Sequence, residues 1–324
     1  MIRHPFRKSK LMKTHEILYQ TLAQAQDYVN GEQLAQEMGL SRTSIWKAIQ
    51  RLEKEGIVIE SVKNRGYKIL SGDLLIPQVI EEHCPLTVSY NPQCQSTQLD
   101  AKNAMEAGGQ SSTLYLAPFQ TAGKGRFGRD YFCPSQGGIY MSLHLKPNLP
   151  FDQAPAYTLM VAAAIYKALK NLALMDIDIK WVNDIYYKGK KVGGILTEAI
   201  SSIETGLITD VIIGVGLNFS ITNFPTELQN KAGSLFESQP AISRNELIAE
   251  IWKEFFNSPE EELIYLYKQR SLVLGKEVCF EQNQTSYQGL AKDISDSGQL
   301  LVQLTDGKER WLNSGEISLK QWDL

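Results

Sequence analysis

The segment "GEQLAQEMGLSRTSIWKAIQRLEKEG" (residues 31–56) constrains the fold more than any other stretch of the chain. Gly39 suits a helix end, because glycine takes the left-handed conformation without steric cost. Ser41 suits a helix N-cap, since its hydroxyl can accept a hydrogen bond from an amide of the first turn. Behind that cap, apolar residues recur at helical spacing at Ile45, Ile49 and Leu52. The pattern predicts two helices joined by a tight turn.

The second predicted helix separates a polar, basic face from its apolar stripe, and two strand-like runs follow at 57–61 and 66–70. Basic and amide side chains near the start of such a helix suit base edges and phosphates, and a basic hairpin tip suits the DNA backbone. We therefore predict a winged helix-turn-helix domain. A small helical domain with a solvated charged face is the alternative. The candidate DNA-binding residues are Arg42, Thr43, Ser44, Lys47, Lys63 and Arg65.

Charge and composition narrow the class of protein. Residues 1–70 hold 12 Lys and Arg against 7 Asp and Glu, whereas the rest holds 21 against 29, so a nucleic acid would meet only the first domain. The chain has 324 residues, enough for two or three domains. It contains no apolar run of membrane length and no signal-peptide pattern, and its four cysteines form no C-x-x-C pair. These features favour a cytoplasmic protein.

The middle of the chain alternates strand-like and helix-like runs after a boundary at "SGDLLIPQ". This order predicts an α+β domain around one mixed or antiparallel sheet. From about Leu274 onward the runs are short and strand-like, which predicts a small β-barrel. The middle segment contains neither an H-E-x-x-H nor a G-x-S-x-G motif, so metal-dependent hydrolysis and serine acyl transfer lack their usual residues.

The loop "TAGKGRFGRD" (residues 121–130) spells G-x-G-x-x-G, yet the chain after it reads as a strand and not as a helix. A dinucleotide site needs that helix, because its N-terminus faces the pyrophosphate. Glycines that let backbone amides approach an anion, with three cations between them, instead suit a loop that closes over a phosphate compound. A solvated basic hairpin is the alternative.

Two further segments point to an anionic ligand. "KWVNDIYYKGKKVGG" places Lys191 beside a Gly-Gly pair, and "IIGVGLNF" places Asn218 after two strand glycines. A lysine inside an apolar sheet is costly to bury unless it meets an anion. The alternatives are a β-turn lysine and a packed glycine strand. Lysines, arginines and glycines together favour stabilisation of charge over a covalent nucleophile.

These three motifs, in this order behind a winged helix-turn-helix, resemble the bifunctional biotin–protein ligases and biotin operon repressors of the BirA family. The resemblance covers nearly the whole chain. It implies a winged helix-turn-helix at 1–72, a catalytic α/β, class II synthetase-like ligase domain on a mixed sheet at 73–272, and an SH3-like β-barrel at 273–324. It implies that ATP and biotin form biotinyl-5′-AMP and diphosphate, and that biotin then passes to a lysine of a carboxyl-carrier protein.

The resemblance also assigns residues. Lys191 and Arg126 would be catalytic, and Mg²⁺ would accompany ATP near Asn183 and Asp184, with no metal site built from protein ligands alone. Biotin would be bound by Ser96, Thr97, Gln120, Gly123, Lys124, Arg126 and Lys191. ATP and the adenylate would be bound by Lys124, Arg126, Arg129, Lys180, Asn183, Asp184 and Asn218. The chain departs from the family at Gln98, often Asn, at Val182, often Pro, and at Lys124, often Arg.

The partners implied are operator DNA, the biotin carboxyl-carrier protein and a second copy of the chain, which would dimerise when biotinyl-5′-AMP binds as corepressor. A non-catalytic, biotin-sensing DNA-binding regulator is the first alternative. A relative that handles lipoate or octanoate is the second. Those acids lack a ureido ring and would make poor use of the polar Ser96, Thr97 and Gln120.

Overall fold

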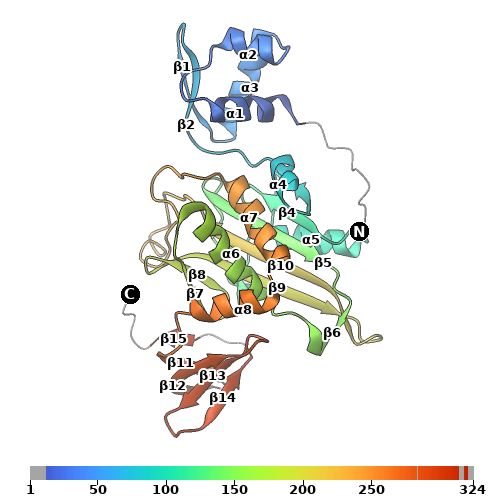
Figure 1. Cartoon of the computed structure of the whole chain (residues 1–324), viewed down its shortest axis with the longest axis vertical. Helices are drawn as coiled ribbons and strands as arrows, with labels where there is room; N and C mark the ends of the chain where they lie inside the picture. Colours follow the sequence, from blue (N-terminus) through green and yellow to red (C-terminus); the bar gives the residue numbers. More distant parts are fainter. Residues whose placement is uncertain (1–11, 283, 314–316, 320–324) are drawn as a thin grey trace.

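The computed structural model describes residues 12–282, 284–313 and 317–319. In Figure 1 they form three parts in chain order: an N-terminal part at the top, a large sheet covered by helices in the centre, and a smaller sheet at the bottom. No helix among the described residues is both long and apolar enough to cross a membrane.

The N-terminal part confirms the predicted winged helix-turn-helix. Its elements are α1 (Thr14–Gln24), α2 (Gly31–Glu37), α3 (Arg42–Lys54), β1 (Val58–Val62) and β2 (Gly66–Ser71), with the two strands paired as an antiparallel hairpin. Gly39 takes a φ of 63° at the turn, and the Ser41 hydroxyl accepts a hydrogen bond from the Ser44 amide. The stripe predicted on α3 is buried against α1 and α2.

The central sheet is mixed, as predicted. Its strands in spatial order are β3 (Thr87–Tyr90), β4 (Thr113–Ala117), β5 (Gly138–Leu145), β10 (Leu207–Asn218), β9 (Lys190–Ser201), β8 (Asp184–Tyr187) and β7 (Asp178–Lys180). The short β6 (Leu149–Pro150) pairs with the start of β10, and a 3-10 turn at Phe151–Gln153 follows it. β3 and β4 run parallel, and the other neighbours in this sheet are antiparallel.

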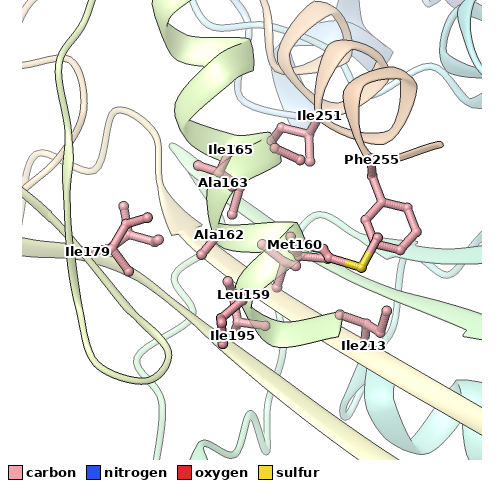
Figure 2. Close-up of a cluster of buried hydrophobic side chains, with 14 of the residues drawn as sticks. Leu159, Met160, Ala162, Ala163, Ile165, Ile179, Ile195, Ile213, Ile251 and Phe255 are labelled. Atoms are coloured by element: carbon pink, nitrogen blue, oxygen red, sulfur yellow. The ribbon is translucent and has the colours of Figure 1, made fainter. Parts of the chain in front are cut away.

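The two faces of this sheet are covered differently. The helical layer on one face contains α6 (Tyr157–Ala173), α7 (Arg244–Asn257) and α8 (Glu260–Gln269), and α4 (Pro77–His83) packs against α7. Figure 2 shows α6 side chains meeting Ile195 and Ile213 of the sheet and Ile251 and Phe255 of α7. The opposite face carries α5 (Thr97–Glu106), which packs on β4, β5 and β10. Because strand side chains alternate between faces, Ile213 joins the helical layer and Ile212 lies under α5.

Helices α7 and α8 were missed by the sequence analysis, which assigned no element between residue 232 and about residue 274. Their signal was nevertheless present. Ser243 and Glu246 form a capping box at the start of α7, in which each side chain accepts a hydrogen bond from the other residue's backbone amide. Pro259 precedes three glutamates in the first turn of α8, which suits the positive end of a helix.

The C-terminal part differs from the predicted barrel. Its strands are β11 (Glu277–Gln282), β12 (Thr285–Ile294), β13 (Leu300–Leu304), β14 (Glu309–Leu312) and β15 (Ile317–Leu319), and they pair in the order β14-β13-β12-β11-β15. Among the described residues, the outer strands β14 and β15 do not pair, so this is an open antiparallel sheet and not a closed barrel. The Trp181 indole donates to the Gly298 carbonyl at 2.9 Å and ties this part to the central sheet.

Candidate active site

One cavity of about 340 Å³ gathers most of the residues that the sequence singles out. It opens on the α5 face of the sheet, because its strand residues lie in register on that face: Gly194 and Leu196 of β9, and Gly214 and Gly216 of β10. The predicted residues that line it are Ser96, Thr97, Gln120, Lys124, Arg126, Arg129, Lys180, Asn183, Asp184 and Lys191. Gly123 and Asn218, also predicted, are not among the residues that line the cavity.

The glycine-rich loop forms one wall of this cavity. The chain turns through a short 3-10 segment at Arg126–Gly128 and then continues into β5, with no α-helix after the glycines, as predicted. A Cβ at Gly123 would lie 2.6 Å from the Cys133 sulfur, so only glycine fits there. Phe127 has a φ of 58° and is 67% exposed, which leaves a large apolar side chain at the mouth of the cavity.

The cations of this loop are already oriented by neighbours. Lys124 pairs with Asp130 across the loop, and the ammonium holds the pKa of the Asp130 carboxyl below its ordinary value. Arg126 donates to the Asn183 Oδ1 at 3.2 Å, and Asn183 is itself fixed because its Nδ2 donates to the Ile195 carbonyl. The loop is thereby tied to the segment that follows β7.

Lys191 lies at the start of β9, where its ammonium is 2.6 Å from the Asp184 carboxylate. Both side chains are partly exposed to the cavity, at 37% for Lys191 and 24% for Asp184. Gly194 lies against this pair: a Cβ there would be 3.6 Å from the Asp184 carboxylate and 3.8 Å from the Lys191 ammonium. A cation held beside a carboxylate in this way is positioned to exchange that partner for an anionic ligand.

The other end of the cavity is polar but uncharged. Thr97, at the start of α5, donates from its amide to the Gln120 Oε1 at 2.7 Å. Gln120 in turn donates from its Nε2 to the Cys133 sulfur at 3.2 Å. Burial raises the pKa of Cys133 to about 11, so the thiol stays protonated and donates to the Tyr131 carbonyl. The cavity is therefore lined by uncharged donors and acceptors at this point, and elsewhere by five cations with Asp130 and Asp184 beside them.

Asn218 acts on the site indirectly. Its buried side chain donates to the Gly233 carbonyl at 2.9 Å, outside the cavity. The segment around Gly233 pairs with the backbone of Lys191, because the Lys191 amide donates to the Lys231 carbonyl and the Gly233 amide donates to the Lys191 carbonyl. In this structure Asn218 anchors the segment next to Lys191, so direct contact with adenine is an expectation that this geometry does not display.

The sequence analysis missed several lining residues. They are Gln98, Tyr131, Ser142, Trp181 and Ile317, all of which line the cavity. The glycines of β10 were the available signal: a Cβ at Gly214 would lie 2.6 Å from the Gln98 Oε1, and one at Gly216 would lie 2.6 Å from the Tyr131 ring. The room that those glycines leave is filled by side chains of the protein.

No cluster of three or more acidic, histidine or cysteine side chains suited to a metal ion occurs in the described part of the chain. Asp184 and Asn183 supply a carboxylate and an amide oxygen at the cavity, which are the hard ligands that Mg²⁺ accepts when substrate phosphates provide the others.

The predicted DNA-binding residues lie together on the N-terminal part. Arg42, Thr43 and Lys47 are exposed on α3 and Ser44 is half-buried, while Lys63 and Arg65 are exposed at the hairpin turn. Arg42 pairs with Glu32 at 2.6 Å, and Arg65 lies 3.1 Å from Asp27 and stacks over the Tyr28 ring. The basic face of α3 and the hairpin tip are both available to a DNA backbone.

Comparison with known proteins follows the same division of the chain. Residues 91–218 match the biotin/lipoate A/B protein ligase family, residues 14–68 match an HTH domain, and residues 273–320 match the biotin protein ligase C-terminal domain. The bifunctional ligase/repressor BirA of Bacillus subtilis is 31% identical over 90% of this chain and 94% of its own length. The protein of that name from Escherichia coli is 27% identical over 91% of this chain.

One solved structure has a fold similar to that of this chain. The biotin protein ligase of Aquifex aeolicus, in complex with biotin and ATP, has a TM-score of 0.60 and 26% identity, covering 72% of this chain and 98% of its own.

Proposed function

This chain belongs to the family of bifunctional ligase/repressor BirA proteins, and from that premise we propose that its cavity condenses biotin with ATP and transfers biotin to a carrier protein. A biotin carboxylate oxygen attacks the α-phosphorus of ATP, diphosphate leaves, and biotinyl-5′-AMP forms. The amine of a carrier lysine then attacks the acyl carbon, AMP leaves, and the nitrogen loses a proton. The N-terminal part binds operator DNA and represses transcription.

One observation carries this proposal: a single cavity brings uncharged polar side chains and five cations together from segments that lie far apart in the sequence. Ser96, Thr97 and Gln120 face the ring of the acid. Lys191 and Arg126 bind the carboxylate and the α-phosphate, so the two anions approach each other and the developing charge is stabilised. Lys124, Arg129 and Lys180 bind the remaining phosphates.

Asp184 and Asn183, which line the cavity, would hold Mg²⁺ together with phosphate oxygens of ATP. When bound with ATP it would neutralise charge on the leaving diphosphate. Two finer features belong to the same proposal: an SH3-like character of the C-terminal sheet, and a homodimer that forms with biotinyl-5′-AMP and presents two α3 helices to a palindromic operator, about 34 Å apart.

The family description also includes lipoate, so a lipoate or octanoate ligase is the second candidate. Against it stands the polar end of the cavity, because an aliphatic or dithiolane tail would leave those buried donors and acceptors unpaired. A sensor without catalysis is the third candidate, and the Lys191–Asp184 pair inside the cavity speaks against it.

The test is isotope exchange between diphosphate and ATP with Mg²⁺, with biotin, lipoate and octanoate offered separately. We expect exchange with biotin alone. Lys191→Ala should lower it by about a hundredfold or more, as expected for loss of a charge that stabilises the transition state. Lys188→Asn, an exposed lysine on the neighbouring turn, is the matched control and should leave exchange unchanged. Exchange with lipoate would contradict biotin as the substrate. Binding of biotin without exchange would favour the biotin-sensing regulator that lacks catalysis.

A further inference from the structure

The orientation of the Gln98 side chain is fixed by its surroundings. Its Nε2 lies 2.8 Å from the Glu198 carboxylate, 3.3 Å from the Ile212 carbonyl and 3.5 Å from the Leu196 carbonyl. All three of these neighbours are acceptors only, so the amide nitrogen must face them. Lys102 pairs with the other oxygen of Glu198 at 2.9 Å and holds the carboxylate in place. The Gln98 Oε1 therefore points toward the cavity floor, where it faces Ser142.

Gln120 is fixed just as firmly from the opposite side. The Thr97 amide can only donate, and it lies 2.7 Å from the Gln120 Oε1, so this oxygen must face Thr97. One Nε2 hydrogen of Gln120 is directed to the Cys133 sulfur. The second Nε2 hydrogen remains for a ligand, since Gln120 lines the cavity.

The hydroxyls of Thr97 and Ser142 lie between these two amide oxygens. The Ser142 hydroxyl donates to the Gln98 Oε1 at 2.9 Å. The Thr97 hydroxyl lies 2.9 Å from the Ser142 oxygen and 3.1 Å from the Gln120 Oε1, and it donates to one of them. Each hydroxyl has a single hydrogen, and both hydrogens are used within the wall. Ser142 is fully buried and reaches a ligand only through Thr97, whose hydroxyl can then only accept from that ligand.

We propose that Gln98, anchored by Glu198, is a positioning residue: it takes the Ser142 hydrogen, leaves the Ser142 oxygen facing the Thr97 hydroxyl, and so keeps Thr97 an acceptor toward an acid whose ring carries N–H donors. This inference rests on the proposed function and deepens it. The cavity then offers the Thr97 hydroxyl as an acceptor, one Gln120 amide hydrogen as a donor, and the Ser96 hydroxyl, which can do either. A cyclic urea, with two N–H groups and one carbonyl, complements that set, and a ring without N–H groups does not.

The first variant is Gln98→Met, which keeps the length of the side chain but removes the acceptor for Ser142. The released Ser142 hydrogen can then be donated to the Thr97 oxygen, where it competes with a ring N–H, and the Kd for biotin, measured by calorimetric titration, should rise about tenfold. Biotin analogues methylated on one ureido nitrogen lack one N–H. The ratio of their Kd to that of biotin should be large in the parent protein and should shrink by about tenfold in Gln98→Met.

A double-mutant cycle separates positioning from packing, because Gln98 is proposed to act through Ser142. In a Ser142→Ala background, Gln98→Met should change the Kd for biotin by less than about twofold. Asn103→Ala, at an exposed position of the same helix, is the matched control and should leave biotin binding and the analogue ratio unchanged. If Gln98→Met does not fold, judged by its melting temperature, Ser142→Ala alone should still narrow the analogue ratio.

The outcomes are distinct. A parent protein that binds biotin, together with a Gln98→Met variant of unchanged Kd and unchanged analogue ratio, would overturn the positioning role alone. A loss of equal size with and without Ser142 would also overturn it, in favour of simple packing. A parent protein that binds no biotin would overturn the proposed function and this inference together.

Discussion

Gly216 shows how a single residue shapes the cavity. A Cβ placed there would lie 2.6 Å from the ring of Tyr131, which is half-buried and donates from its hydroxyl to the Gly216 carbonyl. Gly216→Ala must therefore displace this half-buried ring, and we expect it to lower the free energy of unfolding by about 1–3 kcal/mol. Urea unfolding followed by fluorescence measures this change.

The control for that substitution is Gly125→Ala, where the nearest atom to an added Cβ is 3.8 Å away. It should change the free energy of unfolding by about 0.5 kcal/mol or less. Equal effects at the two positions would show that the Tyr131 ring moves freely and that the close approach at Gly216 has no consequence.

His15 makes the stability of the N-terminal part depend on pH. Burial lowers the pKa of its imidazole below the ordinary value of 6.5, although Glu55 and Glu16 oppose that effect. The unfolded chain then takes up a proton at a higher pH than the folded chain does. The stability that His15 contributes is therefore complete above pH 6.5 and falls as the pH drops below it.

We expect the N-terminal part to melt at a lower temperature at about pH 5.5 than at about pH 7.5, and His15→Gln to show a smaller difference. Scanning calorimetry at the two pH values measures this difference in melting temperature for the parent protein and for the variant. An identical pH dependence in the two proteins would mean that other groups, and not His15, produce it.

At the scale of elements, α7 depends on its N-terminal cap. The Ser243 hydroxyl accepts from the Glu246 amide, and α7 packs along α6 in the main core. Ser243→Ala should destabilise the protein by about 1 kcal/mol, measured by urea unfolding, whereas Ser243→Thr keeps a capping oxygen and should cost less. An equal loss in both variants would assign the effect to side-chain packing instead of the cap.

Elements with strong local signals were predictable from the sequence. The turn at Gly39, the cap at Ser41 and the apolar stripe of α3 all lie within a few residues of one another. The glycine-rich loop is likewise one short segment of the chain. The capping box of α7 was just as local and was overlooked. The open edge of the C-terminal sheet was beyond such reasoning, because closure depends on whether β14 meets β15, and no short pattern encodes that pairing.

The same limit explains what was missed in the site. Gln98 is fixed by Glu198 and Ile212, each about a hundred residues along the chain, so its role arises only when β9, β10 and the start of α5 come together. Asn218 was expected to contact the adenine of ATP because it follows the two strand glycines of the "IIGVGLNF" motif. Its contact with Gly233 depends on the path of a connecting segment that contains no periodic pattern.

At the scale of the whole molecule, the start of α7 clamps the link between the N-terminal part and the central sheet. Asn245 binds the backbone of Leu74 and Ile76 on the buried face of that link. Arg244 pairs with Asp73 and also donates to the Gly138 carbonyl, where β5 begins after the glycine-rich loop. The link is thereby joined to the helical layer and to the strand that follows the glycine-rich loop.

Arg244→Met tests this clamp. The Arg244 side chain is only 8% exposed and its partner Asp73 18%, so the substitution leaves a largely buried carboxylate without its cation. We expect a loss of about 3 kcal/mol in the free energy of unfolding, measured in urea. Arg65→Met removes an exposed pair with Asp27 and should cost less than about 1 kcal/mol.

The double variant Asp73→Asn with Arg244→Met separates two causes of the stability loss: the lost Arg244–Asp73 attraction and the unpaired, largely buried Asp73 carboxylate. If the cost of Arg244→Met comes from the uncompensated Asp73 carboxylate, neutralising that carboxylate should restore about half of the lost stability or more. If Arg244→Met costs no more than Arg65→Met, the link is held by Asn245 alone. The N-terminal part would then be joined to the central sheet through backbone hydrogen bonds, and its attachment would be insensitive to salt, because an ion pair is screened and an amide–carbonyl contact is not.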